Sequence, residues 1–415
     1  MLQEVHVGHK ALADYQSVVA RQLIDEIREL AEGLKDARVL NINATSFGGG
    51  VAEILYTMVP LMRDVGLSAE WRVIMAPQEF YEGTKYMHNA LQGNSVGLDS
   101  AQKEIYETHS RIAAESLAGG FDFVIVHDPQ PLLLRHFAGD LGAKWLWRCH
   151  IDTSTPNQEV ADYLLPYISP YDVSIFSMEQ YVLNGISTPT RVIVPAIDPL
   201  STKNMALSPE DADYVVNQFG VEPYTPLMLQ ISRFDPWKDP LGVIDAYRIV
   251  KERFATVRLA LVGSMATDDP EGWSFFTKTV EHAGDDSDIL ILTNLNNVGN
   301  LEVNAFQSRA DVLIQKSIRE GFGLTVSEAL WKAKPTVGGN VGGIPVQIQD
   351  GETGFLVDSV DECAERCAWI LDNPDEAKAM GRAGKEHVRT HFLMPRLLRD
   401  YLALLTELKQ SATGP

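Results

Sequence analysis

Apolar residues recur along this chain in two patterns that alternate from one end to the other. Short unbroken apolar runs are typical of strands buried on both faces of a parallel sheet, whereas apolar residues spaced by three or four are typical of helices. The alternation occurs in two series, which residues 195–208 separate. We therefore predict an α/β protein of two doubly wound, Rossmann-like domains, with residues 195–208 as the hinge.

The predicted strands share short length and enrichment in β-branched residues, and helical patterns fill the intervals between them. In the first series they are residues 38–43, 71–75, 123–126, 145–150, 173–176 and 192–195. In the second series they are residues 227–231, 258–262, 289–292, 311–315, 335–337 and 354–357. Residues 1–36 are polar with a helical pattern, so we expect them to form a helical extension lying on the first domain.

Length and charge narrow the range of partners. At 415 residues the chain exceeds the size at which single cores stop growing, which agrees with two domains. The net charge of -21 argues against nucleic acid or an anionic membrane as a partner, and any anion site then needs a local cluster of bases. Since neither a signal peptide nor a membrane-span pattern is present, we predict a cytoplasmic protein.

The three cysteines do not suggest a disulfide framework. Cys363 and Cys367, followed by His387 and His391, resemble a zinc spacing. However, residues 361–371 and 375–392 both have helical patterns, and the cysteines share a face with apolar neighbours. We therefore predict that they are small buried side chains and that the chain has no metal site.

A glycine-rich bend joins the predicted strand 311–315 to the predicted helix 324–331. It contains Gly321, Phe322 and Gly323, and Glu320 and Glu328 lie on either side of it. Such a bend lets a ligand approach backbone amides at a positive helix N-terminus. A phosphate-bearing ligand could rest on these amides while the carboxylates hold its hydroxyl groups. The alternative is a plain bend with two solvated acids.

A second glycine-rich loop, residues 46–50, lies between the predicted strand 38–43 and a predicted helix at 51–63. It offers another place where an anion could contact amides. It is not a Walker loop, because no Gly-Lys-Ser/Thr follows, and Glu53 occupies the last glycine position of the dinucleotide fingerprint. A tight turn without a ligand remains the alternative.

Polar residues follow three of the predicted strands, and ligands of parallel sheets bind at such strand ends. Residues 127–131 and 148–152 carry groups that bind hydroxyls or move protons, and His150 could donate to a phosphate oxygen. The alternative is a histidine that is merely hydrogen-bonded. After strand 227–231, Arg233 and Lys238 could pair with a diphosphate, which is the favoured interpretation in so acidic a chain.

Taken together, these motifs resemble the retaining GT-B glycosyltransferases of the sucrose-synthase-like class. Within that class the chain is most similar to the trehalose glycosyltransferring synthases. The resemblance extends from about residue 38 to the C-terminus. It rests on SFGGGVAEIL (46–55), VHDPQP (126–131), WLWRCHID (145–152), SRFDPWK (232–238), LVGSMATDDPEGW (261–273) and SIREGFGLTVSEALW (317–331).

The resemblance implies a GT-B fold, with two Rossmann-like domains and a cleft between them. It implies an N-terminal acceptor domain at residues 1–196 and a nucleotide-sugar donor domain at 197–392. A C-terminal helix in residues 393–415 would cross back onto the first domain. Such enzymes join the glucosyl group of a nucleoside diphosphate glucose, such as ADP-glucose or UDP-glucose, to free glucose, giving α,α-1,1-linked trehalose with retention in a reversible reaction.

The resemblance also implies roles for individual residues. Glu320 would hold donor-glucose hydroxyls, Glu328 the ribose hydroxyls, and His150 the donor sugar. The implied catalytic residues are Glu320, His150, Arg233 and Lys238, and the implied donor-binding residues are Gly49, Gly50, Arg233, Lys238, Gly321, Phe322, Gly323, Leu324, Thr325 and Glu328. The candidates for acceptor glucose are Asp128, Gln130 and Asp152.

For cofactors and partners, the resemblance implies no tightly bound cofactor, with Mg²⁺ only as a stimulating ion. It implies NDP-glucose, glucose and trehalose as ligands and allows a homodimer. A covalent intermediate would need a carboxylate nucleophile, and none stands out, so the expected reaction proceeds on one face of the sugar. The alternatives are a trehalose phosphorylase, another nucleotide-sugar-dependent retaining glycosyltransferase, and a non-catalytic sensor, against which the presence of all four implied catalytic residues argues.

The acceptor is predicted to be a free sugar and not a sugar phosphate. Residues 127–131 and 149–157 contain no lysine or arginine and carry Asp128 and Asp152. Two carboxylates repel a phosphate dianion but accept hydrogen bonds from hydroxyls. Arg148 stands close to these residues, and we predict that it lies on the opposite face of the pleat from His150 and points away from it.

Overall fold

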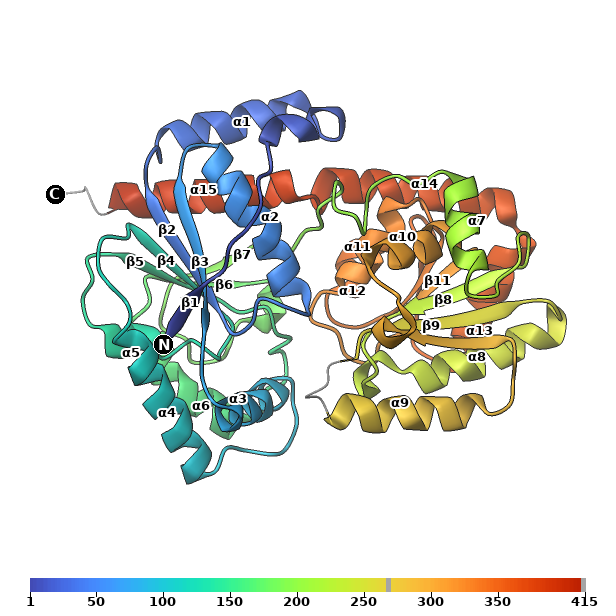
Figure 1. The fold of residues 1–415 in the computed structure, drawn as a ribbon, viewed down its shortest axis with the longest axis horizontal. Coiled ribbons are helices and arrows are strands. Elements are labelled where there is room, and N and C mark those ends of the chain that lie inside the picture. Colours follow the sequence, from blue (N-terminus) through green and yellow to red (C-terminus); the bar gives the residue numbers. More distant parts are fainter. Residues whose placement is uncertain (266–269, 412–415) are drawn as a thin grey trace. The chain divides into compact units, whose positions relative to one another are not determined.

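The computed structural model describes residues 1–265 and 270–411. The chain divides into two compact units, Met1–Ala196 with Met394–Pro415 and Ile197–Leu393 (Figure 1). In each unit, helices cover both faces of one sheet (Figure 1). The alternating pattern of the sequence predicts this architecture, because each apolar strand needs cover on both sides.

The first unit contains a seven-stranded sheet. Its elements are β1 (Leu2–Glu4), η1 (Leu12–Ser17), α1 (Arg21–Glu32), β2 (Arg38–Asn43), α2 (Gly50–Asp64), β3 (Ser68–Ile74), α3 (Gln78–Leu91), α4 (Ser100–Ala114), β4 (Phe123–His127), α5 (Leu134–Ala138), β5 (Lys144–Arg148), α6 (Gln158–Ile168), β6 (Val173–Phe176), η2 (Glu179–Tyr181), β7 (Thr190–Val192) and α15 (Met394–Ser411).

The strand order of this sheet is β1-β3-β2-β4-β5-β6-β7, and every pair is parallel except β1 with β3. The chain passes from β2 to β3 on one side and then adds β4 on the other side of β2. Asn41 of β2 lies opposite Ile125 of β4. The loops that follow β2 and β4 therefore emerge side by side, which is the arrangement at which such sheets bind ligands.

The second unit contains a six-stranded, all-parallel sheet. Its elements are α7 (Pro209–Asn217), β8 (Leu227–Ile231), η3 (Pro236–Lys238), α8 (Pro240–Arg253), β9 (Arg258–Gly263), α9 (Pro270–Ala283), β10 (Ile289–Thr293), η4 (Asn294–Asn296), α10 (Asn300–Arg309), β11 (Val312–Gln315), α11 (Leu324–Trp331), β12 (Thr336–Gly339), α12 (Ile344–Gln347), β13 (Phe355–Val357), α13 (Val360–Asp372) and α14 (Pro374–His391).

The order of the second sheet is β10-β9-β8-β11-β12-β13. The chain runs from β8 outward through β9 and β10, and then returns to place β11 on the other side of β8. Val312 of β11 lies opposite Met228 of β8. The order reverses between β8 and β11, so the loops after these two strands lie at a second point where ligands are expected to bind.

Alternate side chains of the second sheet belong to two separate cores. Met228, Leu259 and Ile314 pack on one face with helices α8 and α13, whereas Leu229 and Leu313 pack on the other with α7 and α10. This division follows from the period of two along a strand. Full burial of such a side chain contributes about 1.5–3 kcal/mol, so both cores hold the strand ends, and hence the loops, in place.

Some sequence predictions are wrong in detail. Residues 1–36 are not wholly helical, because Leu2–Glu4 forms an antiparallel edge strand with Leu2 opposite Ile74. Three residues are too few for a strand pattern to show. The last strand of the first sheet is Thr190–Val192, earlier than the predicted 192–195, and Pro195 has no backbone N–H to extend the pairing.

Helix α15 completes the first unit. Its apolar face, which includes Leu398, Leu402 and Leu405, is buried. Arg396 donates hydrogen bonds to the carbonyl oxygens of Val194 (2.8 Å) and Pro195 (3.0 Å).

Along the described part of the chain, no helix is both long and apolar enough to cross a membrane.

Cys363 and Cys367 are fully buried in the core beneath α13, as predicted for small apolar-like side chains. His387 Nε2 lies 3.3 Å from the carbonyl oxygen of Val346. Among the described residues, no group of three or more His, Cys, Asp or Glu side chains could hold a metal ion.

Candidate functional site

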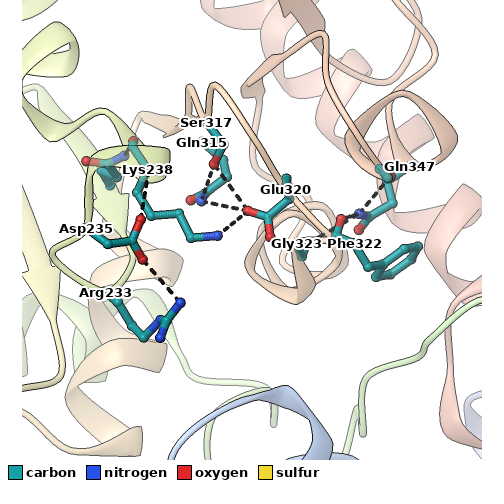
Figure 2. A network of polar contacts seen from close by, with 11 residues as sticks. Arg233, Asp235, Lys238, Gln315, Ser317, Glu320, Phe322, Gly323 and Gln347 are labelled. Carbon is teal, nitrogen blue, oxygen red and sulfur yellow. Dashed lines mark hydrogen bonds and ion pairs between the residues drawn. The ribbon is translucent and has the colours of Figure 1, made fainter. Parts of the chain in front are cut away.

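Lys238 and Glu320 meet at the point where the second sheet reverses its order. Lys238 ends η3, after β8, and Glu320 lies in the loop after β11. Lys238 Nζ is 2.6 Å from Glu320 Oε2, and the two side chains are only 15% and 8% exposed. Figure 2 shows this pair at the centre of a polar network. Residues 82 positions apart in the sequence thus form one ion pair because β8 and β11 are neighbours.

Two further side chains fix the carboxylate of Glu320. Ser317 Oγ donates to Glu320 Oε2 over 3.2 Å, and Gln315 Nε2 contacts the same oxygen at 3.5 Å and Ser317 Oγ at 3.1 Å (Figure 2). Both residues come from the end of β11, which is buried. The carboxylate of Glu320 therefore has a defined orientation.

The loop carrying Lys238 is held at both of its ends. Asp235 caps η3 by accepting the Lys238 N–H at 3.2 Å. Asp239, in a left-handed conformation with φ 48°, caps α8 by accepting the Gly242 N–H at 3.1 Å and also pairs with Lys316. Aspartate tolerates this conformation better than most residues and is a strong N-cap. Local capping therefore places Lys238 above β8.

Arg233 has a different environment from Lys238. Its guanidinium lies 3.2 Å from Asp235 Oδ2, and 64% of the side chain is exposed (Figure 2). An arginine held by one carboxylate at the surface can turn its planar donor fork toward an incoming diphosphate. Arg233 and Lys238 thus lie on the same short loop, the first exposed and the second partly buried.

The glycine bend after Glu320 depends on one glycine within it, Gly323, and on a second, Gly343, that packs against it. Gly323 has φ 82°, a left-handed conformation that favours glycine. At Gly343, before α12, a Cβ atom would lie 2.7 Å from the Cα atom of Phe322, so a side chain there cannot fit. The bend therefore packs directly against the chain leading into α12.

Gln347 of α12 fixes the carbonyls of this bend. Its Nε2 donates to the carbonyl oxygens of Phe322, Gly323 (3.3 Å) and Gly343 (3.2 Å), while its Oε1 accepts from Ser327 Oγ (Figure 2). The amide is fully buried. With its carbonyls held on this side, the bend leads into α11 at Leu324.

Helix α11 begins at Leu324, with Gly323 as its N-cap residue. The first amides of a helix lack partners within it and carry a partial positive charge. Leu324 and Thr325 are partly exposed there, whereas Phe322 is buried against Phe392 with ring centroids 5.7 Å apart. The predicted donor-binding stretch thus contributes backbone at 321–325 and one anchoring ring.

Glu328 is fully buried on the inner side of α11. Lys203 Nζ lies 2.9 Å from its Oε1, and Gln307 Nε2 donates to its Oε2 over 3.1 Å. Burial alone would raise the pKa of Glu328, but the charges of Lys203 and Lys332 and these hydrogen bonds hold that pKa below its usual value. Burial lowers the pKa of Lys332 to about 7. Glu328 therefore belongs to a charged cluster within the second unit.

In the first unit, Gly49 and Gly50 form the N-terminus of α2. The helix starts at Gly50, and Gly49 is its N-cap with φ 106°. A Cβ atom at Gly49 would meet nothing within 4 Å, so the backbone angle, and not crowding, requires glycine there. The prediction of a strand, a glycine loop and a helix is confirmed for this stretch.

His127 and His150 stand together at the ends of β4 and β5. His127 Nδ1 lies 3.1 Å from His150 Nε2, and the rings are nearly parallel with centroids 5.4 Å apart. His127 Nε2 lies 3.1 Å from Asn41 Oδ1 of β2. His127 is buried and His150 is partly exposed. These contacts depend on the neighbouring positions of β2, β4 and β5 in the sheet.

Asp128 follows His127 in a left-handed conformation, with φ 64°. Its Oδ1 accepts the backbone N–H of His150 at 2.7 Å. Burial raises the pKa of Asp128 to about 7, although the hydrogen bond from His150 and the charge of Arg148 oppose this shift. Near neutral pH the carboxyl group is thus present in both protonation states and can either donate or accept a hydrogen bond.

Three aromatic side chains hold the backbone of residues 128–132. Trp147 Nε1 donates to the carbonyl oxygen of Asp128 (3.1 Å), Tyr106 to that of Pro129, and Tyr171 to that of Leu132 (2.6 Å). Gln130 lies on this segment and is partly exposed. The sequence alone gives no signal for these anchors, because buried aromatic residues usually have only a packing role.

Asp152 is buried and folds onto its own loop. Its Oδ1 accepts both the backbone N–H (3.0 Å) and the hydroxyl (2.6 Å) of Ser154. Arg148 is 1% exposed and donates to the carbonyl oxygen of Phe176 (2.9 Å) and to Ser177 Oγ (3.2 Å). Its guanidinium is engaged inside the first unit, and although Arg148 was predicted to point away from His150, its charge lowers the pKa of that histidine.

The predicted residues thus fall into two groups. We call Arg233, Lys238, Glu320, residues 321–325 and Glu328 the second-unit site. We call Gly49, Gly50, Asp128, Gln130, His150 and Asp152 the first-unit site. Sequence reasoning missed His127 as a partner of His150, Lys203 as a partner of Glu328, and Gln347. Part of the 261–273 motif, residues 266–269, lies outside the described residues.

Family models match both units. The model described as "Trehalose synthase, N-terminal domain" matches residues 41–183, and the model "Glycosyl transferases group 1" matches residues 216–387. The first includes the loops after β2, β4 and β5. The second includes Arg233, Lys238, Glu320 and Glu328.

Curated relatives match almost the whole chain. Trehalose synthase of Rubrobacter xylanophilus is 59% identical over 414 residues, covering 98% of this chain and 99% of that protein. Trehalose synthase of Pyrococcus horikoshii is 47% identical over 410 residues, with the same coverage. Trehalose phosphorylase of Pleurotus pulmonarius is 26% identical, and the match spans 92% of this chain but 58% of that protein.

Solved structures share the fold. Sucrose-phosphate synthase from Thermosynechococcus elongatus superposes with a TM-score of 0.71 at 16% identity, covering 90% of this chain and 100% of that one. An α,α-trehalose-phosphate synthase (UDP-forming) from Burkholderia xenovorans gives 0.74 at 14% identity, covering 89% and 99%. The predicted GT-B fold is confirmed. With this fold, both family models and 59% identity over nearly its full length, the chain belongs to the trehalose synthase family of glycosyltransferases.

Proposed function

We propose that this protein is a retaining glucosyltransferase that forms α,α-1,1-linked trehalose from a nucleoside diphosphate glucose and free glucose, in a reversible reaction. The observation that carries the proposal is the Lys238–Glu320 pair beside the N-terminus of α11. The loops after β8 and β11 thereby offer a cation and amides for a diphosphate, next to an oriented carboxylate for sugar hydroxyls. The names of the relatives at 59% and 47% identity supply the product.

Binding of the donor is assigned to the second-unit site. An ammonium has three N–H donors, so Lys238 can keep Glu320 and still donate to phosphate oxygens. Arg233 adds a second cation to a chain with a net charge of -21. Glu320 holds hydroxyls of the donor glucose, and Glu328 holds the ribose once the nucleoside enters the cluster around Lys203. Any Mg²⁺ would act as a stimulating ion.

The reaction breaks the bond between the anomeric carbon and the diphosphate and forms a bond from that carbon to the anomeric oxygen of glucose. The proton of the acceptor hydroxyl moves to the departing phosphate oxygen, and both events occur on one face of the sugar. Arg233, Lys238 and the α11 amides stabilise the charge on the leaving group, while Asp128 and Gln130 orient the acceptor.

The direct test is incubation of the purified protein with trehalose and ADP, UDP or GDP in turn, followed by chromatography. The proposal expects a sugar nucleotide with at least one of the three. Inorganic phosphate in place of the nucleotide is the control for a trehalose phosphorylase, to which the chain is 26% identical. Glucose 1-phosphate from phosphate, with no product from any nucleotide, would contradict the proposal.

A second test separates the two glutamates. Titration calorimetry with the nucleoside diphosphate alone is expected to show weaker binding for Glu328→Gln and nearly unchanged binding for Glu320→Gln. Glu320→Gln is expected to lower kcat instead, because its partner lies beside the reacting carbon. A strong loss of nucleotide binding in Glu320→Gln, with none in Glu328→Gln, would reverse the two roles.

A further inference from the structure

A chain of three side chains runs across the end of the first sheet, from Asn41 through His127 to His150. Asn41 Oδ1 lies 3.1 Å from His127 Nε2, and His127 Nδ1 lies 3.1 Å from His150 Nε2. Asn41 and His127 are 1% and 2% exposed. Both nitrogens of His127 are therefore engaged inside the protein, and only His150 reaches the surface.

This geometry determines which nitrogens carry protons. A neutral imidazole has one N–H donor and one acceptor nitrogen. Since Asn41 presents its carbonyl oxygen, His127 must carry its proton on Nε2, and its Nδ1 is then an acceptor. For His150 Nε2 to donate a hydrogen bond to this acceptor nitrogen, His150 must carry its proton on Nε2. In neutral His150, Nδ1 consequently bears no proton.

The surroundings keep both rings neutral. Burial and the nearby charge of Arg148 lower the pKa of His127 to about 3 and hold the pKa of His150 well below its usual value. Arg148 itself is fixed by Phe176 and Ser177 and cannot leave. Near neutral pH neither histidine therefore gains the second proton that would remove the distinction between its nitrogens.

We propose that His127 is a positioning residue that sets the tautomer of His150, so that His150 Nδ1 serves as a hydrogen-bond acceptor for a sugar hydroxyl. The role of the acceptor nitrogen rests on the proposed function, whereas the tautomer itself does not. This assignment differs from the sequence-based idea that His150 donates to a phosphate oxygen. An unprotonated nitrogen also suits a sugar ring that gains positive charge in the transition state.

Asn41 controls which atoms donate and which accept in the hydrogen bonds that link Asn41, His127 and His150. Turning its amide by 180° would present an N–H₂ group to His127 and would place the proton of His150 on Nδ1. Within the described residues, Asn41 Nδ2 is buried without a hydrogen-bond partner. The orientation of the Asn41 amide and the tautomer of His127 are therefore linked, and substitutions at position 41 test both.

The first experiment is NMR of the ligand-free protein labelled with ¹⁵N-histidine. We expect a protonated Nε2 and a non-protonated Nδ1 for His150 between pH 6 and 8, and the same for His127. His127→Phe should convert His150 into a mixture of tautomers. A protonated Nδ1 on His150 in the wild-type protein would overturn the proposal, whatever the enzyme's substrates are.

The second experiment compares steady-state kinetics of variants that remain folded by thermal unfolding. His127→Phe and Asn41→Leu should lower kcat by about 10- to 10²-fold with little change in the KM for the nucleotide sugar. Asn41→Asp retains an acceptor and should keep kcat within about threefold of the wild type, a rescue that a packing role alone would not predict.

His282→Phe is the matched control, because His282 contacts Asp245 and belongs to neither site. Its kcat should equal that of the wild type. Equal losses in Asn41→Asp and Asn41→Leu would overturn the proposal. Absence of transferase activity in the wild type would contradict the proposed function, while the NMR result would still decide the tautomer.

Discussion

The two sites occupy the same topological position in their sheets but handle charge in opposite ways. In the second-unit site, Lys238 pairs with Glu320 and Lys203 pairs with Glu328, each over a short distance. In the first-unit site, the histidines are held neutral and the pKa of Asp128 is raised to about 7. A doubly wound sheet thus fixes where a site forms, and the loop side chains decide what it binds.

The difference suggests a division of labour. Fixed cations and amides suit a diphosphate, which remains charged throughout the reaction. Neutral donors and acceptors suit the hydroxyls of a sugar. Arg148, the arginine nearest to the first-unit site in sequence, is turned inward and adds to this neutrality by lowering the pKa of both histidines.

The largest expected effect comes from removing a charge within the second-unit cluster. Glu328→Gln leaves Lys203 and Lys332 facing an amide, and loss of one partner of a buried ion pair costs about 3–5 kcal/mol of unfolding free energy. Because the pKa of Glu328 is lowered in the folded state, this contribution is present above the usual pKa and is lost as pH falls through the folded pKa. Denaturant unfolding at pH 7 and pH 4 measures it; an unchanged midpoint at pH 7 would show that the cluster is not stabilising.

The next effect concerns the diphosphate clamp. Lys238→Ala removes the partly buried cation, and loss of such a contact is expected to lower kcat by about 10²–10³-fold. Arg233→Ala is also expected to lower kcat, by less, because Arg233 is 64% exposed and solvent screens its charge. Steady-state assays measure both. Lys251→Ala is the control, since Lys251 pairs with Asp286 and Asp288 in the same unit; near-normal turnover in Lys238→Ala would rule out the clamp.

A smaller effect should appear in the choice of acceptor. With equal glucose and glucose 6-phosphate, we expect trehalose as the main product, with a preference of about 10²-fold in kcat/KM. Because the pKa of Asp128 is about 7, its charge grows as pH rises, and the preference should be greater at pH 8.5 than at pH 6. Chromatography measures the ratio of trehalose to trehalose phosphate at each pH. Trehalose phosphate as the main product would contradict the assignment of a neutral acceptor to the first-unit site.

The smallest effect is on stability and isolates Asp128. Its folded-state pKa is raised, so the protonated form contributes stability that is lost as pH rises through about 7. Asp128→Asn mimics the protonated group and tolerates φ 64°. It should be more stable than the wild type by about 1–2 kcal/mol at pH 8.5, allowing for partial exposure, and by almost nothing at about pH 3, where the unfolded aspartate is also protonated. Equal differences at the two pH values would contradict the raised pKa.

The sequence was sufficient for the fold and for naming Lys238 and Glu320, which the order of the second sheet brings into contact. It was not sufficient for contacts that depend on side-chain geometry. The partnership of His127 with His150 requires the register of β4 with β5, and that of Lys203 with Glu328 joins a turn to a helix 125 residues away. The strand Leu2–Glu4 was not predicted, because three residues are too few to show the apolar pattern of a strand.

The aromatic anchors of residues 128–132 have a consequence for redesign of the enzyme. The carbonyls of this segment are held by Trp147, Tyr106 and Tyr171, which lie on β5, on α4 and before β6. The backbone conformation of residues 128–132 thus depends on three side chains from outside the segment and not on the segment's own side chains. If Gln130 contacts the acceptor, as the proposed function has it, a library that varies Gln130 should explore new acceptors without rebuilding the loop, whereas replacing any of the three anchors should alter the shape of the whole segment.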